Sequence, residues 1–458
     1  MTTVAPPTAQ QAAHGSPDKL KTAFGSAVGT TIENYDFLAY GTAAALYFGT
    51  DFFPNTDPVV GVLLGFLTFG IGFAMRPIGG IIGGYLGDKI GRKPVLVGAL
   101  FVMGISTVLI GLLPTYAQVG LLAPLLLTAI RVIQGLAFGA EWGGAILMTF
   151  EHAPWKHRGR YSAIPQAGVP FGVFLANLAF LATAGFDSEW AWRLPFLFSS
   201  VLIIAGIIIR LKVSESPEFV ATKSTGMVVK NPIATVIRED WRNILRVIGL
   251  RLAETGGFYV IVTYMISYIT SNQLADRQTA LTGLIIATGL GIFTTVFWGS
   301  LSDRLGRKTM YLIGSAATIV FGFPMFLLVN TGVPFLIIGV YFLALTIIHD
   351  LLAGTQGAYF SELFPIHTRT SGASLGYQFS AAISGFIPFI ATAAAAAMGW
   401  TGVAWIFVAV GVIGFIAALL TRETWGKKER AEVDAIIAGA GAAPAAPAAS
   451  ASSAADAK

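Results

Sequence analysis

The sequence contains no cysteine and little charge. None of its 458 residues is Cys, and only 12% are Asp, Glu, Lys or Arg, against 55% hydrophobic residues. The missing thiols exclude a secreted scaffold held by disulfides and a metal or nucleophile site built on thiolates. Soluble globular domains carry about 25% charged residues, so this chain has too little charge to cover a water-facing surface. The composition predicts an integral membrane protein.

Signatures of catalysis and of cofactor binding are also missing. The sequence has no His-Glu-x-x-His zinc pattern and no Walker A loop, the patterns that bind a catalytic zinc ion or ATP. We therefore expect no enzyme activity, no metal and no cofactor. A net charge of +5 suggests nucleic acid in a soluble protein. Here the basic residues follow the membrane topology instead, so the expected surroundings are a lipid bilayer and no nucleic acid.

Long apolar runs are abundant. A hydrocarbon core about 30 Å thick is crossed by about 20 apolar residues in a helix. Twelve segments of this kind, numbered here as spans 1 to 12, are predicted at 24–48, 59–86, 94–113, 119–150, 161–184, 193–211, 244–270, 279–301, 309–329, 333–361, 370–398 and 401–421. The expected fold class is an all-α membrane protein with twelve transmembrane helices.

The placement of Lys and Arg predicts the orientation. The N-terminal segment, the loops after even-numbered spans and the C-terminal tail should share one side. Together with Arg210 and Arg246 at the adjoining span ends, they hold 24 of the 29 Lys and Arg residues. Only Arg193 and Arg277 fall on the opposite side. Because cytoplasmic loops carry the basic excess, we expect a multi-pass protein of the cell membrane with both termini in the cytoplasm. The first 20 residues have no apolar core, so no cleaved signal peptide is expected.

The chain divides into five segments. These are a polar cytoplasmic N-terminus (1–23), an N-terminal six-helix half (24–211), a charged cytoplasmic linker with short helical pieces (212–243), a C-terminal six-helix half (244–421) and a cytoplasmic tail (422–458). Residues 439–458 are rich in Ala, Pro and Ser, which are poor core formers, so the end of the tail should be disordered.

An internal repeat supports the two halves. The loop at 84–93 reads Gly-Tyr-Leu-Gly-Asp-Lys-Ile-Gly-Arg-Lys, and the loop at 299–308 reads Gly-Ser-Leu-Ser-Asp-Arg-Leu-Gly-Arg-Lys. Glu, Pro and Arg recur with identical spacing at 151, 154 and 158 and at 362, 365 and 369. A looser pair joins positions 33 and 36 to positions 251 and 254. Such repeats predict two halves related by an axis along the membrane normal, with a substrate site between them near the midplane.

The repeated loops predict a cytoplasmic gate. Gly at a helix end permits a tight turn, and Asp followed by basic residues can bridge neighbouring helix ends when the halves rock. The alternative is a plain positive-inside turn, which explains the basic residues but not the paired pattern. The expected gate residues are Gly84, Asp88, Gly91, Arg92, Lys93, Glu151, Arg158, Asp303, Arg307, Lys308, Glu362 and Arg369.

These paired motifs resemble the signature loops of the major facilitator superfamily. Further stretches at 33–37, 75–80, 131–135, 139–142 and 192–196 resemble its metabolite:proton symporters, which move shikimate, 2-oxoglutarate, citrate, and proline or betaine. The first stretch has Asn34 where that group commonly has an aromatic residue, which leaves the substrate more open. The resemblance implies the twelve-helix fold and proton-coupled uptake of a small metabolite.

Ionisable residues inside the spans are the candidate functional groups, because each costs at least about 2.5 kcal/mol in the hydrocarbon and therefore marks a pathway. They are Glu33, Asp36, Arg76, Arg131, Glu141, Arg251, Glu254, His349 and Asp350. Glu33 and Asp36 are three residues apart and share a helix face, so the pair predicts that one carboxyl carries a proton at neutral pH. Glu141 and Glu254 are the other expected proton-coupling residues. The alternative is permanent ion pairing with arginines.

The substrate site is expected around Arg131. Arg131, Gln134 and Glu141 lie along one stripe of span 4, and a guanidinium there can hold a carboxylate through two hydrogen bonds. The expected substrate-binding residues are Arg131, Arg76, Arg251, Gln134, Tyr35, Tyr40, Trp142, Gln166 and Gln378. Alternatives stay open: Arg131 as a packing partner of the span 1 carboxylates, a structural pair of Arg251 with Glu254, and aromatic side chains that only pack.

His349 is read as a hydrogen-bonding contact between helices. The charges of span 4 have no counterparts in the second half, since the repeat offset leads to Phe342 and Leu352. Much of the chemistry is therefore expected in the N-terminal half, joined by Arg251 and Glu254 of span 7.

The sequence predicts a secondary transporter that works as a monomer by alternating access and imports a small organic acid anion with protons. Three embedded arginines favour the anion. The alternatives are uptake of a zwitterionic osmolyte and a membrane sensor on the same fold.

Overall fold

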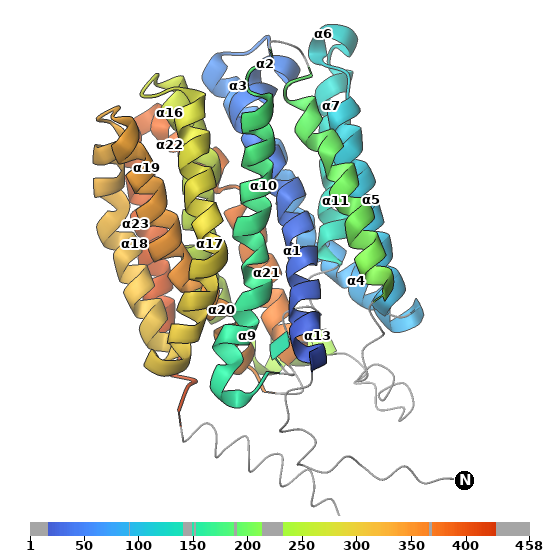
Figure 1. Ribbon diagram of the computed structural model, residues 1–458, viewed down its shortest axis with the longest axis vertical. Helices are drawn as coiled ribbons and strands as arrows, with labels where there is room; N and C mark the ends of the chain where they lie inside the picture. Colours follow the sequence, from blue (N-terminus) through green and yellow to red (C-terminus); the bar gives the residue numbers. More distant parts are fainter. Residues whose placement is uncertain are drawn as a thin grey trace, which may run out of the picture.

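All regular secondary structure in the described part of this computed structural model is helical (Figure 1). The structure describes residues 17–90, 92–140, 149–150, 153–186, 190–212, 232–365 and 369–426. Each of the twelve predicted spans corresponds to helical structure, which confirms the expected fold class.

In the N-terminal half the spans are, in order, α1 (Pro17–Ala43) with η1 (Ala44–Phe48), α3 (Pro58–Ala74) with α4 (Arg76–Ile90), α5 (Arg92–Leu112), α7 (Leu122–Gly139), α9 (Arg158–Gln166) with α10 (Gly168–Thr183), and α11 (Arg193–Lys212). Short helices α2 (Gly49–Phe52), α6 (Tyr116–Val119) and η2 (Trp155–His157) lie in connections.

Span 7 runs from α14 (Trp241–Arg251) through η3 (Leu252–Gly256), α15 (Gly257–Tyr259) and η4 (Val260–Tyr264) to α16 (Met265–Ser271). The remaining spans are α17 (Arg277–Leu305), α18 (Arg307–Val329), α19 (Pro334–Phe342) with η5 (Leu343–His349) and α20 (Asp350–Glu362), α21 (Arg369–Ser384) with α22 (Ile387–Met398), and α23 (Trp400–Leu419). The linker contributes α13 (Pro232–Glu239).

The outer surface of the bundle is apolar. Large side chains such as Phe335, Phe293 and Val320 are 80%, 74% and 73% exposed. An apolar surface of this extent is stable only against lipid. Nine helical stretches within the described residues are long and apolar enough to cross a membrane. Spans 1, 6 and 7 are helical too but are not among these nine, and the apolar helix of span 6 is shorter than the others.

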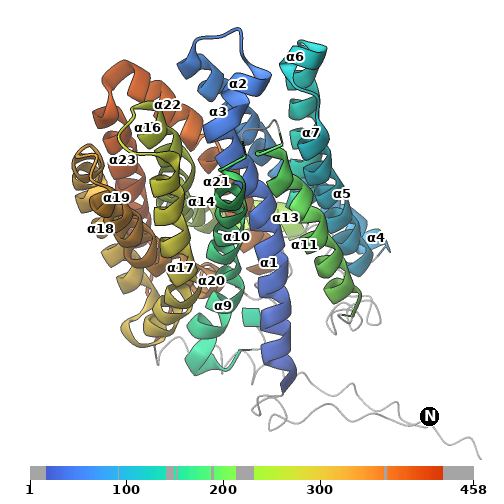
Figure 2. The same ribbon diagram turned by 45° about the horizontal axis from the view of Figure 1, so that its top comes forward.

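The two halves lie side by side, with the helices coloured blue to green on one side and most of those coloured yellow to red on the other (Figure 1). They meet where α10 packs against α17, where α9 packs against α17 and α20, and where α3 and α4 pack against α21 and α22. Helix α1 begins and α23 ends at the same end of the bundle, called here the terminal end (Figures 1 and 2).

In the second copy of the repeated loop, the turn is made by the second glycine of the motif and not by the first. Gly306 connects α17 to α18 with a positive φ of 97°, a conformation that favours glycine. Gly84 and Gly299 instead lie inside α4 and α17, so the tight turn predicted at a helix end falls at the second glycine of the motif. At Gly299 a Cβ would overlap Ala163 and stand 2.9 Å from the carbonyl oxygen of Gly354. This glycine permits close approach of α9, α17 and α20.

Helix α7 lies in backbone contact with α3 and α4. A Cβ on Gly135 would overlap the carbonyl oxygen of Gly72, and one on Gly139 would overlap that of Arg76. Close contact through small residues is how membrane helices gain dispersion energy without a hydrophobic driving force. Because Gly135 is one turn from Arg131, this contact also fixes the position of the arginine.

We predict that Gly135→Ala lowers the free energy of unfolding by roughly 1–3 kcal/mol, the cost of overpacking a close contact. Thermal unfolding of the purified protein in detergent measures it. Gly98→Ala on α5 is the matched control, because nothing lies within 4 Å of its Cβ position. Equal stability of the two variants would contradict the close α7 contact.

Candidate functional site

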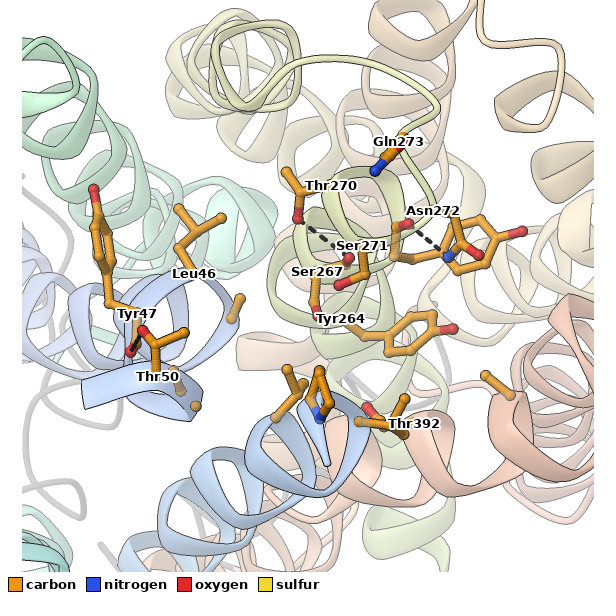
Figure 3. Close-up of a pocket in the computed structure, with 18 of the residues that line it drawn as sticks. Leu46, Tyr47, Thr50, Tyr264, Ser267, Thr270, Ser271, Asn272, Gln273 and Thr392 are labelled. Carbon is orange, nitrogen blue, oxygen red and sulfur yellow. Dashed lines mark hydrogen bonds between the residues drawn. The ribbon is translucent and has the colours of Figure 1, made fainter. Parts of the chain in front are cut away.

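A cavity of about 1240 Å³ opens between the halves at the end opposite to the termini. Figure 3 shows Leu46, Tyr47 and Thr50 on one side of it and Tyr264 and Ser267 on the other. Its lining combines Ala, Val and Pro side chains with phenols of η1, η4 and α16, hydroxyl groups of α16 and α22, and the amides of Asn272 and Gln273. We call it the outer cavity.

The predicted site lies deeper in the bundle. None of its described residues lines the outer cavity, and the predicted carboxylates and guanidinium groups are at most 6% exposed. Along span 1 the cavity begins at Ala44, whereas Asp36 lies eight positions earlier, about 12 Å further along the helix. Phe69 and Phe73 of the N-terminal half contact Tyr259 of the C-terminal half, with ring centroids 5.5 and 5.3 Å apart.

Arg131 and Asp36 form the core of the site in the N-terminal half. Arg131 donates from Nη1 to Gln134, and Gln134 Nε2 lies 2.7 Å from Thr107 Oγ1. Both carboxylate oxygens of Asp36, and Nε and Nη2 of Arg131, are buried without a hydrogen-bond partner among the described residues. Asp36 lies in the electrostatic field of Arg131 and Glu33. A carboxylate and a guanidinium are thus close, yet each keeps unused hydrogen-bonding capacity.

Aromatic rings hold the Arg131 guanidinium in place. Its Cζ lies 4.0 Å from the ring centroid of Tyr40 and 4.6 Å from that of Phe37. Cation–π contact of this kind favours a charge in an apolar region. On another side the group packs on Gly72, whose missing side chain leaves 3.0 Å between its Cβ position and Nη2.

Arg76 joins the two halves. Its Nε donates to Gln378 Oε1 at 3.2 Å, and Gln378 Nε2 donates to the carbonyl oxygen of Gly139 at 3.3 Å. Its guanidinium lies 3.8 Å from the ring centroid of Phe138. Arg76 is predicted to bind substrate, yet only 3% of it is exposed. Two predicted substrate-binding residues, Arg76 and Gln378, therefore contact each other across the boundary.

The C-terminal half holds a second charged cluster. Arg251 pairs with Glu254 at 3.4 Å and donates to Gln356 Oε1 at 2.9 Å. Gln356 Nε2 in turn donates to Glu254 Oε1 at 3.2 Å. The guanidinium also lies over the Tyr377 ring, 3.1 Å from its centroid. The local Arg251–Glu254 pair, one of the two alternatives open from the sequence, is present.

His349 extends this cluster. Its Nε2 lies 3.2 Å from Glu254 Oε1, and its Nδ1 lies 3.0 Å from Asp350 Oδ1. Thr294 donates to the other oxygen of Asp350 at 2.5 Å. His349 is thus a hydrogen-bonding contact between helices, as expected. Arg251 and Glu254 are the two residues of the C-terminal half that the sequence joins to the chemistry of the N-terminal half, and His349 and Asp350 extend that pair.

Other predicted residues lie in different surroundings. The Tyr35 hydroxyl donates to the carbonyl oxygen of Pro195 at 2.6 Å, so Tyr35 packs within its own half. The Tyr40 hydroxyl bonds Thr68 at 2.6 Å, while its ring contacts Arg131. Gln166 is buried with Nε2 unpartnered among the described residues. Glu141 and Trp142 lie outside the described residues.

The predicted gate residues meet at the terminal end. Asp303 of α17 accepts from the backbone N–H groups of Gly159 and Arg160 at 2.8 and 2.9 Å, and so caps the start of α9 in the other half. A carboxylate at a helix N-terminus is stabilised by the helix dipole. Arg307 donates to Asp303 at 2.7 Å and lies 3.5 Å from Glu362.

Other gate residues complete this region or lie outside its description. Arg158 packs over Phe150 and Trp155, Arg369 donates to the Ser361 carbonyl oxygen, and Lys308 donates to the carbonyl oxygens of Leu419 and Thr421. Gly91 and Glu151 lie outside the described residues, and so do the side chains of Asp88, Arg92 and Lys93.

The sequence did not predict the contacts made by the first residues of the tail. Glu423 accepts from the backbone N–H groups of Arg307 and Lys308 at 2.7 and 3.1 Å, and so caps α18. Trp425 stacks on Trp155 of the N-terminal half, with ring centroids 6.0 Å apart. The segment after α23 therefore crosses the gate. No sequence signal marks these residues beyond a Glu and a Trp after the last span.

Comparison with known proteins identifies a matching family and several relatives. The model of the Major Facilitator Superfamily matches residues 27–387. The chain is 36% identical to a shikimate transporter of Escherichia coli (strain K12), over 88% of this chain and 94% of that protein. It is 32% identical to a proline/betaine transporter of the same strain, over 89% and 84%. The crystal structure of a D-xylose–proton symporter shares the fold, with a TM-score of 0.65 and 19% identity over 90% and 99% of the chains.

We predict that Asp303→Asn opens the terminal end, because the neutral amide loses the charge that caps α9 and pairs with Arg307. Spin labels are attached at Lys156→Cys and Arg304→Cys, one in each half. Double electron–electron resonance then reports the opening as a longer distance between the two labels. The absence of native cysteine leaves no other labelling site.

Asp276→Asn is the matched control. Asp276 caps its own helix, accepting from Thr279 N at 2.8 Å, so its loss leaves the halves in contact. An unchanged label distance in Asp303→Asn would contradict the gate role.

Proposed function

The chain belongs to the major facilitator superfamily, and from that premise we propose that this membrane transporter imports a small organic acid anion together with protons. The observation that carries the proposal is the buried guanidinium of Arg131, which lies in the electrostatic field of Asp36. A buried guanidinium with two unpartnered nitrogens is suited to a carboxylate, since charge-assisted, paired hydrogen bonds are strong where water is excluded. The relation to a shikimate transporter supports the substrate class.

Charge balance supplies a reason for proton coupling. In the predicted site of the N-terminal half, Arg76 lies in the electrostatic field of Glu33 and Arg131 in that of Asp36. This set is neutral when all four are ionised. An incoming anion adds one negative charge to a region of low dielectric, where an unbalanced charge is costly. Protonation of Asp36 restores neutrality, so binding of the anion favours uptake of a proton.

The contrast between the two ends of the bundle supports alternating access. The outer cavity opens at one end, while Asp303 and the segment after α23 hold the halves together at the other. With both termini in the cytoplasm, as the basic residues indicate, this conformation faces outward. Rocking of the halves breaks the Asp303–α9 contact and closes the outer cavity. The whole pathway lies within one chain, so we propose that the monomer of the plasma membrane is active.

A zwitterionic osmolyte is the alternative substrate. Asp36 beside Arg131 offers both charges that a zwitterion presents, and a relative is a proline/betaine transporter. A sensor on the same fold would bind ligand without moving it. Uptake and counterflow measurements distinguish both alternatives from import of an anion.

The test is uptake into proteoliposomes with an inward proton gradient, using shikimate, 2-oxoglutarate, citrate, proline and betaine as probes. We expect accumulation of one of the acids above the outside concentration, and exchange of that acid in counterflow. Accumulation of betaine or proline alone would favour the osmolyte. Binding of a probe without counterflow would favour the sensor.

We predict that Arg131→Lys lowers uptake of the transported acid by roughly 10- to 100-fold, because a charged hydrogen-bonding group contributes about 1.5–3 kcal/mol and lysine cannot form the paired bonds. Membrane insertion and thermal stability should be retained. Initial uptake rates against concentration measure the effect.

Arg193→Lys is the matched control, a buried arginine that donates to the carbonyl oxygens of Gly111 and Leu113 at 3.1 and 2.5 Å. Replacement of Arg193 should lower the thermal stability of the protein, while the KM for uptake changes little. Near-normal uptake by Arg131→Lys would refute the role proposed for Arg131.

We predict that Asp36→Asn abolishes accumulation driven by the proton gradient while counterflow continues, because the amide cannot take up a proton. A pH electrode outside the vesicles measures the coupling as alkalinisation on addition of substrate. Wild-type alkalinisation in the variant would count against Asp36.

A further inference from the structure

We infer that His349 and Asp350 hold a proton in the C-terminal half, and that this is a second titratable site for the coupling of transport, separate from Asp36. The inference rests on the proposed function for its role in transport. Its structural part stands on the geometry of the cluster that His349 joins.

The position of His349 is that of a cation between two anions. Its two ring nitrogens lie 3.2 Å from a Glu254 oxygen and 3.0 Å from an Asp350 oxygen, and the side chain is 4% exposed. A neutral imidazole has one donor and one acceptor nitrogen, whereas the protonated ring donates from both. Two carboxylate acceptors on opposite nitrogens therefore fit the protonated ring.

The charge of the surrounding cluster requires the same proton. The titratable groups in contact with His349 are Glu254 and Asp350. Arg251 pairs with Glu254, and Tyr259, Tyr311 and Tyr377 lie around that pair. Tyrosine phenols are neutral at pH 7. Among these groups one guanidinium faces two carboxylates, so the cluster carries one excess negative charge. A proton on His349 neutralises it in a region where charge is costly.

The backbone is shaped for this contact. His349 is the last residue of the π-helical turn η5, and Glu254 lies in the π-helical turn η3. Such turns are rare within helices and occur often at functional sites. Phe258 stacks on the imidazole, with ring centroids 4.6 Å apart, which fixes the plane of the ring between the two carboxylates.

Asp350 gives the proton a route to the boundary between the halves. A Cβ at Gly291 would stand 3.2 Å from Asp350 Oδ2 and 2.9 Å from Pro170 of the N-terminal half. Asp350 therefore lies next to the α10–α17 contact, which is part of the boundary between the halves. In the step inferred here, the proton on His349 Nδ1 passes to Asp350 Oδ1 along their 3.0 Å contact. Asp350 then releases it to water at the opened boundary and returns to a carboxylate.

The first experiment needs no substrate. Ring nitrogens of ¹⁵N-histidine-labelled protein in liposomes are observed by solid-state NMR at pH 7, and the signals of His349 are those lost in His349→Asn. We expect both ring nitrogens of His349 to be protonated. A neutral ring, with one unprotonated nitrogen, overturns the inference whatever the protein transports.

The second experiment tests the role in transport, using the acid that wild-type protein accumulates in the probe panel. His349→Asn should retain counterflow but reach only equal concentrations inside and outside under a proton gradient. Asp350→Asn is the second variant and should behave alike. Gln356→Met is the matched control, because Gln356 contacts the same Glu254 oxygen at the same 3.2 Å but cannot titrate, and it should still accumulate the acid.

Accumulation by both His349→Asn and Asp350→Asn overturns the inference. Loss of counterflow in both, or equal loss of accumulation in Gln356→Met, assigns the cluster a purely structural role and also overturns it. If wild-type protein accumulates none of the probes, the proposed function fails, while the NMR result still decides where the proton lies.

Discussion

Neutralisation of buried charge is the constraint on which this structure depends. The interior of the bundle holds guanidinium and carboxyl groups that are almost wholly shielded from water, and the surrounding surface is apolar. An isolated ion in such surroundings would be prohibitively costly. The charges are therefore gathered into two compact clusters, one in each half, and the Arg76–Gln378 contact joins the halves between them. Neutrality of each cluster then depends on protons and on the charge of a bound ligand.

The same constraint relates the gate to the site. At the terminal end the halves are held together by Asp303 at the N-terminus of α9 and by the segment after α23. Both become exposed to water when the halves part. In the proposed cycle, parting of the halves near the midplane exposes charged groups to water and changes which protonation state is stable. The proposal therefore couples a conformational change between the halves to a change in protonation through solvation.

The sequence predicted those contacts that depend on helix spacing or on repetition. Arg131 and Gln134, and Arg251 and Glu254, are three residues apart and do form contacts. The repeated loops correctly placed Asp303, Arg307 and Glu362 together. Contacts between distant spans were not predictable, because periodicity does not tell which helices adjoin, and so the pairing of Arg76 with Gln378 was missed. The π-helical turn at His349 changes side-chain directions, and Glu423 lies beyond the last periodic segment.

The central claim is that a bound anion is balanced by a proton taken up at the site. Calorimetric titration of the wild-type protein with the acid it transports, repeated in buffers of different ionisation enthalpy, counts the protons bound with each ligand. The account predicts net uptake of about one proton per anion near neutral pH, as linkage between ligand charge and protonation requires. Binding that is equally tight but takes up no proton at any pH would contradict it.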